Sequence, residues 1–226
     1  MRYITTAVLI LIVSLTFAGG TYTSLGEALK NPNDVKQLNL RDKGLVVLPE
    51  SIAKFVNLER LNISENNLTE LPKALFGLKK LKYLNISSNN IEVLPASIAN
   101  LKNLEELEIG YNKIAALPKE VGGLTRLTRL VATKNQLKAL PAELSQLSSL
   151  QIVELNYNAF STLPTPLTSL KGLKSLDISF NKLLTTFPKE MKNLTSLRLL
   201  NIKSTKIAEN KLSELGWLIP QCQVML

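Results

Sequence analysis

The sequence contains no histidine and a single cysteine, Cys222, among its 226 residues. Histidine is the side chain that titrates near neutral pH, and histidine and cysteine are the usual ligands of zinc. Their scarcity removes most metal sites and most acid–base machinery, and one cysteine cannot form an internal disulfide. We therefore expect no cofactor and no metal ion. The fold must be held by its hydrophobic residues, which make up 45% of the chain.

The first twenty residues differ from the rest. Arg2 is followed by an apolar run, residues 7–18, and then by the small residues Gly19 and Gly20. This is the layout of a secretory signal peptide, and the run is shorter than the roughly 20 apolar residues of a membrane span. We predict a signal peptide over residues 1–20, cleaved after Gly20, and a secreted, periplasmic or cell-surface product without a membrane span. An uncleaved anchor is the alternative.

Leucines recur every 23 residues, and each opens a similar unit. Two examples are LERLNISENNLTELPKALFGLKK and LKYLNISSNNIEVLPASIANLKN. The openings are Leu58, Leu81, Leu104, Leu127, Leu150 and Leu173. A degenerate unit precedes them, the unit from Leu173 has one extra residue, and a last unit begins at Leu197. The chain therefore holds eight repeats over residues 35–207, a period typical of a solenoid.

Each unit combines two apolar patterns. In Leu61-Asn62-Ile63 the apolar residues alternate, as in a strand with one buried face, and the leucines that follow are three or four residues apart, as in a helical turn. Pro72 fixes its own φ and starts the second segment. One unit cannot bury these leucines alone, so the units must stack.

The pattern LxxLxLxxNxLxxLPxxIxxLxx resembles the leucine-rich repeat, in the 23-residue subtype of bacterial secreted and surface proteins and of some intracellular scaffolds. The resemblance implies an α/β repeat solenoid, a right-handed curved horseshoe arc. A parallel concave sheet of about eight strands would line one side and helical or 3₁₀ turns the convex side. Residues 21–34 would form an N-terminal helical cap. Ser24 and Glu27 have the spacing of a capping box, which predicts a helix over residues 25–30 that ends before Pro32. Residues 208–226 would form a C-terminal cap, with a helix over residues 210–219 and with Trp217 and Cys222 inside.

An asparagine recurs at the ninth position of the repeat, counted from the opening leucine. The six are Asn66, Asn89, Asn112, Asn135, Asn158 and Asn181. An inward amide can donate to and accept from the backbone groups that a turn leaves without partners. In the family these residues form a ladder along the stack, so we interpret them as structural.

The concave face is expected to carry positions three, five and seven, with position eight beside them. Aromatic side chains recur at position eight, next to carboxylates at positions three and five, and exposed aromatics beside charges are what protein interfaces use. The predicted partner-binding residues are Arg60, Asn62, Tyr83, Glu106, Glu108, Tyr111, Arg129, Glu154, Tyr157, Asp177 and Phe180. The alternative is that the aromatics only pack on their neighbours.

Basic residues outnumber acidic ones, giving a net charge of +9, or +8 without Arg2. The excess lysines fall on the predicted convex segments, and no basic stripe follows the concave face, so nucleic acid is not expected as a partner. A glycosidase would need two carboxyl groups in a cleft, and calcium would need converging oxygen ligands, and an open solenoid face offers neither.

We therefore predict a non-catalytic binding module, with a protein of unknown identity as its partner and with no oligomer required. Two alternatives stay open. One is an envelope-associated structural protein held by its basic convex surface. The other, if residues 1–20 are not a signal peptide, is an intracellular Ras-type leucine-rich-repeat scaffold.

Overall fold

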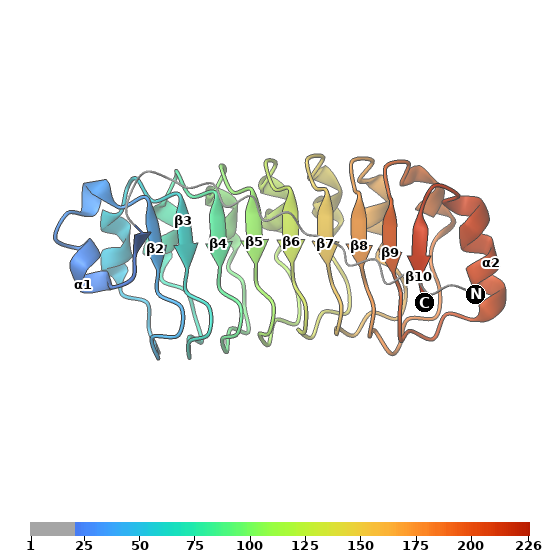
Figure 1. Cartoon of the computed structure of the whole chain (residues 1–226), viewed down its shortest axis with the longest axis horizontal. Coiled ribbons are helices and arrows are strands. Elements are labelled where there is room, and N and C mark those ends of the chain that lie inside the picture. Colours follow the sequence, from blue (N-terminus) through green and yellow to red (C-terminus); the bar gives the residue numbers. More distant parts are fainter. Residues whose placement is uncertain (1–20) are drawn as a thin grey trace, which may run out of the picture.

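The structure is a computed structural model that describes residues 21–226, and the predicted signal peptide lies outside these residues. Ten parallel strands stand side by side in one open sheet, in chain order (Figure 1). They are β1 (Thr21–Tyr22), β2 (Gln37–Asn39), β3 (Arg60–Asn62), β4 (Tyr83–Asn85), β5 (Glu106–Glu108), β6 (Arg129–Val131), β7 (Ile152–Glu154), β8 (Ser175–Asp177), β9 (Leu199–Asn201) and β10 (Gln223–Met225). The predicted solenoid with a parallel sheet is confirmed. Eight strands come from the repeats, and β1 and β10 extend the sheet at its ends.

The register of the sheet follows the repeat without slippage. Leu84 of β4 pairs with Leu107 of β5, which is one repeat further on, and Leu107 pairs with Leu130 of β6. In each of β2 to β9 the middle residue is buried and the two flanking residues are half-buried. Side chains at positions three and five therefore form continuous rows on the outer face of the sheet, the predicted concave face.

Short 3₁₀ helices form the opposite layer. They are η1 (Pro32–Asp34), η2 (Glu50–Lys54), η3 (Lys73–Gly77), η4 (Ala96–Asn100), η5 (Lys119–Gly123), η6 (Ala142–Gln146), η7 (Thr165–Ser169) and η8 (Lys189–Asn193). From η2 onward each begins directly after the proline of its repeat, for example Pro72 with φ −66°. Proline fixes φ near this value and so sets the start of each helix.

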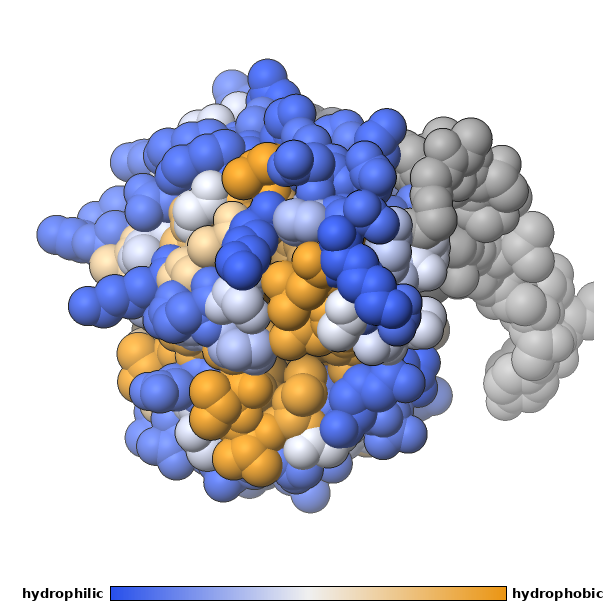
Figure 2. Space-filling view, turned by 90° about the vertical axis from the view of Figure 1, so that its left-hand side faces the viewer, coloured by the Kyte–Doolittle hydropathy of each residue, from blue (hydrophilic) through white to orange (hydrophobic). Residues whose placement is uncertain are grey.

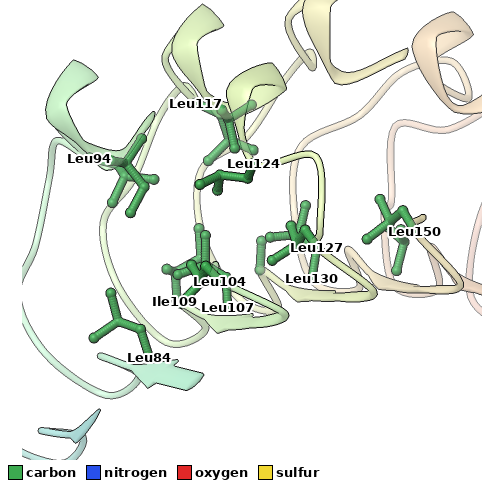
Figure 3. Close-up of a cluster of buried hydrophobic side chains, with 14 of the residues drawn as sticks. Leu84, Leu94, Leu104, Leu107, Ile109, Leu117, Leu124, Leu127, Leu130 and Leu150 are labelled. Atoms are coloured by element: carbon green, nitrogen blue, oxygen red, sulfur yellow. The ribbon is translucent and has the colours of Figure 1, made fainter. Parts of the chain in front are cut away.

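The hydrophobic core runs as one column between the sheet and the 3₁₀ layer. Leucines from successive repeats point into the same space, so that Leu84, Leu107 and Leu130 are fully buried and follow one another along the sheet (Figure 3). Burying a leucine stabilises the fold by roughly 1.5–3 kcal/mol relative to an exposed one. Every repeat thus depends on its neighbours for its stability.

The two ends carry α-helices. At the N-terminal end α1 (Leu25–Ala28) is shorter than the predicted helix, and Ser24 makes no capping hydrogen bond through its side chain. Seen from this end, apolar side chains reach the surface among hydrophilic ones (Figure 2). Within residues 21–226 the most exposed apolar residues of the first repeat are Val46 and Val47.

At the C-terminal end α2 (Glu209–Leu218) matches the predicted helix to within one residue. The prediction that Trp217 lies inside this cap is wrong, because its side chain is 88% exposed. The helix turns Leu215 toward the core, and a residue two positions further on lies about 200° around a helix, on its outer side. No helix of the described chain is long and apolar enough to cross a membrane.

Candidate binding face

The turn that ends each strand has the same backbone in all eight repeats. Position eight has a positive φ of 52–57° in every repeat, whether it is occupied by Asp42, Ser88, Lys134 or Phe180. The left-handed conformation costs an ordinary residue roughly 1–2 kcal/mol. Hydrogen bonds maintain it: the N–H of Tyr111 donates to the carbonyl of Thr133 in the next repeat at 2.7 Å, and the same bond recurs along the stack. Position-eight side chains are thereby held at one rim of the sheet.

The ninth-position asparagines lie behind this rim and bind the backbone of two repeats. In Asn89, Oδ1 accepts the N–H of Leu68 at 3.0 Å, and Nδ2 donates to the carbonyls of Ile63 and Ile86, each at 3.0 Å. The other five asparagines repeat this pattern. They fix the turns that position the rim.

Position seven is less open than expected. Ser64, Thr133 and Ser179 are buried. The hydroxyl of Ser179 donates to Asp177 Oδ1 at 2.6 Å, and that of Thr133 donates to Asn156 Oδ1 at 2.7 Å. These polar groups still belong to the outer face, because Ser64, Ser87, Thr133 and Asn156 line a depression in it.

Charged residues gather at the centre of the outer sheet face. Nη2 of Arg129 lies 2.8 Å from Oε1 of Glu154, and its Nε lies 4.0 Å from Oε1 of Glu108. Nδ2 of Asn85 donates to Oε2 of Glu108 at 2.8 Å. Glu106, in the same strand as Glu108, forms no ion pair within residues 21–226. Two carboxylates therefore share one guanidinium, and a third lies beside them.

The same region is hollowed. A depression of about 550 Å³ follows the outer face across β3 to β7 and the turns after them, and Tyr83, Glu108, Tyr111 and Glu154 line it. The short side chain of Val131 lies between Glu108 and Glu154 in the position-five row, and the guanidinium of Arg129 lies between the two carboxylates.

Aromatic side chains stand along the hollow and beyond it. The guanidinium of Arg60 lies 4.1 Å from the ring centre of Tyr83, and Nζ of Lys134 lies 5.0 Å from that of Tyr111. Further along the rim, Tyr157 and Phe180 stack with ring centres 4.2 Å apart and planes inclined by 5°. The aromatics do pack on neighbours, and yet Tyr111 and Tyr157 remain 51% and 45% exposed.

Comparison with known families agrees with this geometry. Models described as leucine-rich repeat region match residues 23–109 and 77–137, and a single leucine-rich repeat matches residues 172–194. This chain belongs to the leucine-rich repeat family. No curated protein sequence matches it.

Several solved structures resemble this leucine-rich repeat protein. One from Leptospira interrogans is 34% identical, with a TM-score of 0.74 over 91% of this chain and 58% of that one. An internalin of Listeria monocytogenes is 23% identical, with a TM-score of 0.73 over 90% and 57%. The ectodomain of an Arabidopsis thaliana membrane receptor kinase, solved in complex with Casparian strip integrity factor 2, is 20% identical, with a TM-score of 0.66 over 88% and 28%. At these identities the last two share the fold alone. This protein spans less than two thirds of each of the three.

The structure of this leucine-rich repeat protein brings part of the predicted site together. Asn62, Tyr83, Glu108, Tyr111 and Glu154 line the hollow. Arg60, Glu106 and Arg129 occupy the position-three row beside it. The remaining three lie toward the C-terminal end, where Tyr157 stacks on Phe180 and Asp177 accepts hydrogen bonds from Ser179 and Asn201.

The sequence did not predict two features of the hollow. Nη2 of Arg41 lies 2.7 Å from Oε1 of Glu65, which closes the N-terminal side of the hollow. Asn85 joins Glu108 to the hydroxyl of Tyr83, to which it donates at 3.1 Å. The repeat spacing places these residues in neighbouring repeats, but the sequence does not show which partner a long side chain contacts.

The remaining reactive group lies at the C-terminal cap. Cys222 is partly exposed rather than buried, and burial still raises the pKa of its thiol to about 11. Such a thiol stays protonated near neutral pH, which agrees with a packing role. Among residues 21–226 no group of three or more potential ligands could hold a metal ion.

Glu108 gives a pH-dependent prediction. Burial raises the pKa of this carboxyl, Arg129 lowers it, and Glu106 and Glu154 raise it further. A raised pKa in the folded state means that ionisation opposes folding. We expect Glu108→Gln to raise the melting temperature at pH 7 by roughly one to two degrees. The gain should vanish as the pH falls below about 4.3, the ordinary pKa of glutamate. Thermal melts of both proteins from pH 3 to 8 measure this, with the exposed Glu92→Gln as control. A less stable variant at pH 7 would show that Arg129 outweighs burial.

Proposed function

We propose that this leucine-rich repeat protein is a non-catalytic binding module, secreted or periplasmic, that holds a protein partner against its concave face. The hollow at the centre of this face is the observation that carries the proposal, because it joins charged residues with half-exposed aromatic rings. Aromatic residues in partly desolvated pockets supply much of the binding energy in protein interfaces. The leucine-rich repeat fold commonly mediates binding between proteins.

The rigidity of the face supports the same function. Its side chains lie on strands and on turns tied by hydrogen bonds from one repeat to the next. A preformed surface loses less conformational entropy on binding than a flexible one. The apolar pattern of residues 1–20 supports export.

The test is the replacement of Tyr111, Tyr157 and Phe180 together by alanine. A partner captured from the native environment by the unaltered protein should bind the triple variant at least ten times more weakly, because the variant loses three rim contacts. Binding is measured by calorimetry or surface plasmon resonance. The matched control replaces Val93 and Trp217, which are exposed and lie outside the hollow, and should bind normally.

Two outcomes would contradict the proposal. Equal binding by the triple variant and the unaltered protein would show that the partner docks elsewhere. Release of the protein from envelope material by moderate salt, with no protein partner recovered, would favour attachment through the exposed convex lysines instead.

A further inference from the structure

We propose that one flank of the solenoid binds the surface of an anionic lipid membrane. This basic flank consists of the segments that lead into each repeat strand from the 3₁₀ helix before it, namely residues 35–36, 55–59, 78–82, 101–105, 124–128, 147–151, 170–174 and 194–198. It is the side from which the strand arrows start in Figure 1. The concave face stays open when the flank is occupied, so the inference goes beyond the proposed function and does not depend on it.

The basic flank carries most of the net charge of the described chain. It holds nine lysines and arginines and only two acidic residues, Glu59 and Glu105, which gives a net charge of +7. All other parts of residues 21–226 together add +1. The convex 3₁₀ helices η2 to η8 hold five basic and four acidic residues, and the opposite flank, between each repeat strand and the helix that follows it, holds eight and four. The excess positive charge therefore lies mainly on one side of the solenoid.

Little of this charge is neutralised within the protein. Among residues 21–226, Lys82 is the only cation of the basic flank in an ion pair, with Oε2 of Glu59 at 2.8 Å. Lys79 and Lys80 lie one repeat away from Lys102, and neighbouring repeats are about 4.8 Å apart at the sheet. This is well within the distance of about 8 Å beyond which physiological salt screens charges. The lysines therefore repel one another in the free protein, and an anionic surface relieves that repulsion.

Neutral amides hold two of these cations in place. Nζ of Lys80 donates to Oδ1 of Asn57 at 2.7 Å, and Nη1 of Arg126 donates to Oδ1 of Asn103 at 2.8 Å. Each asparagine in turn donates from Nδ2 to a backbone carbonyl 24 residues earlier, at 2.7 Å. The amides thus orient the cations without cancelling their charge, and such preorganisation lowers the entropy lost on binding.

The shape of the basic flank fits a planar ligand. The carbonyl of Lys36 accepts the N–H of Glu59 at 2.8 Å, and the corresponding bond recurs from each repeat to the next. The strands pair without a shift in register, so the segments in front of them end at one level, over about 34 Å from β2 to β9. A solenoid of this kind curves between its concave and convex sides, which leaves its flanks level. A single anionic chain would have to follow the arc, whereas a lipid surface meets the whole flank at once.

Vesicle binding tests this inference. Residues 21–226 are used because they hold the hydrophobic core and both caps, and because they lack the apolar run of residues 7–18, which would itself enter lipid. The protein is sedimented at low salt with vesicles of phosphatidylcholine, alone or mixed with an equal part of phosphatidylglycerol. We expect binding to the anionic vesicles to be at least about ten times tighter than to the neutral ones. About 1 M salt, which screens charges beyond about 3 Å, should release the protein.

The flank variant combines Lys79→Gln, Lys80→Gln and Lys102→Gln. Each basic residue near an anionic lipid surface raises the affinity about fivefold, so this variant should bind the anionic vesicles at least about thirtyfold more weakly. All three side chains are exposed, so the circular dichroism spectrum and the melting temperature should match those of the unaltered protein.

The matched control combines Lys113→Gln, Lys138→Gln and Lys182→Gln. These lysines are also exposed, but they lie on the opposite flank, so the control removes the same net charge from the other side of the solenoid. Its affinity for the anionic vesicles should change less than about threefold.

Equal weakening in the flank variant and the control would show that net charge rather than this flank attracts the vesicles, and would overturn the inference. Capture of soluble polyphosphate by a protein that binds no anionic vesicles would assign the flank to a dissolved polymer and would overturn it as well. Failure here is separable from failure of the proposed function. The aromatic triple variant should still bind anionic vesicles, and the flank variant should still bind a captured protein partner.

Discussion

Replacing Asn181 by alanine is expected to cost about 3 kcal/mol or more of the free energy of unfolding. This amide is fully buried, and its Oδ1 accepts the N–H of Phe160 at 3.1 Å. Its Nδ2 donates to the carbonyls of Leu155 and Ile178, at 3.1 and 2.8 Å. Alanine leaves the N–H of Phe160 and the carbonyl of Ile178 without partners, whereas the carbonyl of Leu155 still accepts from the amide of Asn158. Each loss costs roughly 1–3 kcal/mol when water cannot enter. Denaturant unfolding followed by circular dichroism measures the difference.

The matched control for this change is Asn135→Ala. Asn135 makes the same hydrogen bonds, with Ile114 and Ile109, but it is only half-buried. Water can replace its amide, so we expect roughly half the cost. If the two variants lose equal stability, burial is not what sets the strength of the asparagine ladder. If Asn181→Ala loses less than about 1 kcal/mol, the backbone groups find other partners.

Replacing Gly122 by alanine is expected to cost roughly 1–3 kcal/mol, the usual range for overpacking. A Cβ at this position would lie 2.5 Å from the carbonyl oxygen of Glu143 and 2.8 Å from its Cβ. The first of these atoms belongs to the backbone of η6, so the two neighbouring 3₁₀ helices would have to move apart. The melting temperature should fall by several degrees, measured by calorimetry.

Gly77→Ala tests whether this effect comes from packing. Gly77 also lies in a 3₁₀ helix, but an added Cβ would meet no atom within 4 Å. Alanine restricts the unfolded chain more than glycine does, so this variant should be unchanged or stabilised by up to about 1 kcal/mol. Similar losses in both variants would mean that alanine is unsuited to these helices in general, and the close contact with Glu143 would not be the cause.

The fold could be predicted from the sequence because the same structural signals recur in eight repeats. Leucine spacing, the proline before each 3₁₀ helix and the recurring asparagines all describe one repeating backbone. The caps have no such repetition. The sequence therefore could not show that α1 would end at Ala28, or that Trp217 would lie on the outer side of α2.

For the candidate site, the sequence predicted only which row of the outer face each residue occupies. Counting positions from each leucine gave the residues that share the outer face, including Glu108 and Tyr111. It did not give the bridge from Arg129 to two glutamates, because the direction of a long side chain depends on partners in other repeats. Nor did it show that Ser64, Thr133 and Ser179 at position seven would be buried, because their hydrogen-bond partners became visible only in the structure.

Position eight keeps the same backbone conformation whichever side chain it carries. The shape of the turn and the chemistry of its side chain are therefore independent of each other. Asp, Glu, Ser, Tyr, Lys and Phe all occupy the same left-handed backbone, held by a hydrogen bond that involves only main-chain atoms. The rim is therefore a set of interchangeable sites at regular intervals along a fixed frame. A substitution at position eight, natural or engineered, can therefore change what the rim recognises at that one residue. The backbone and the spacing of the other rim residues stay the same.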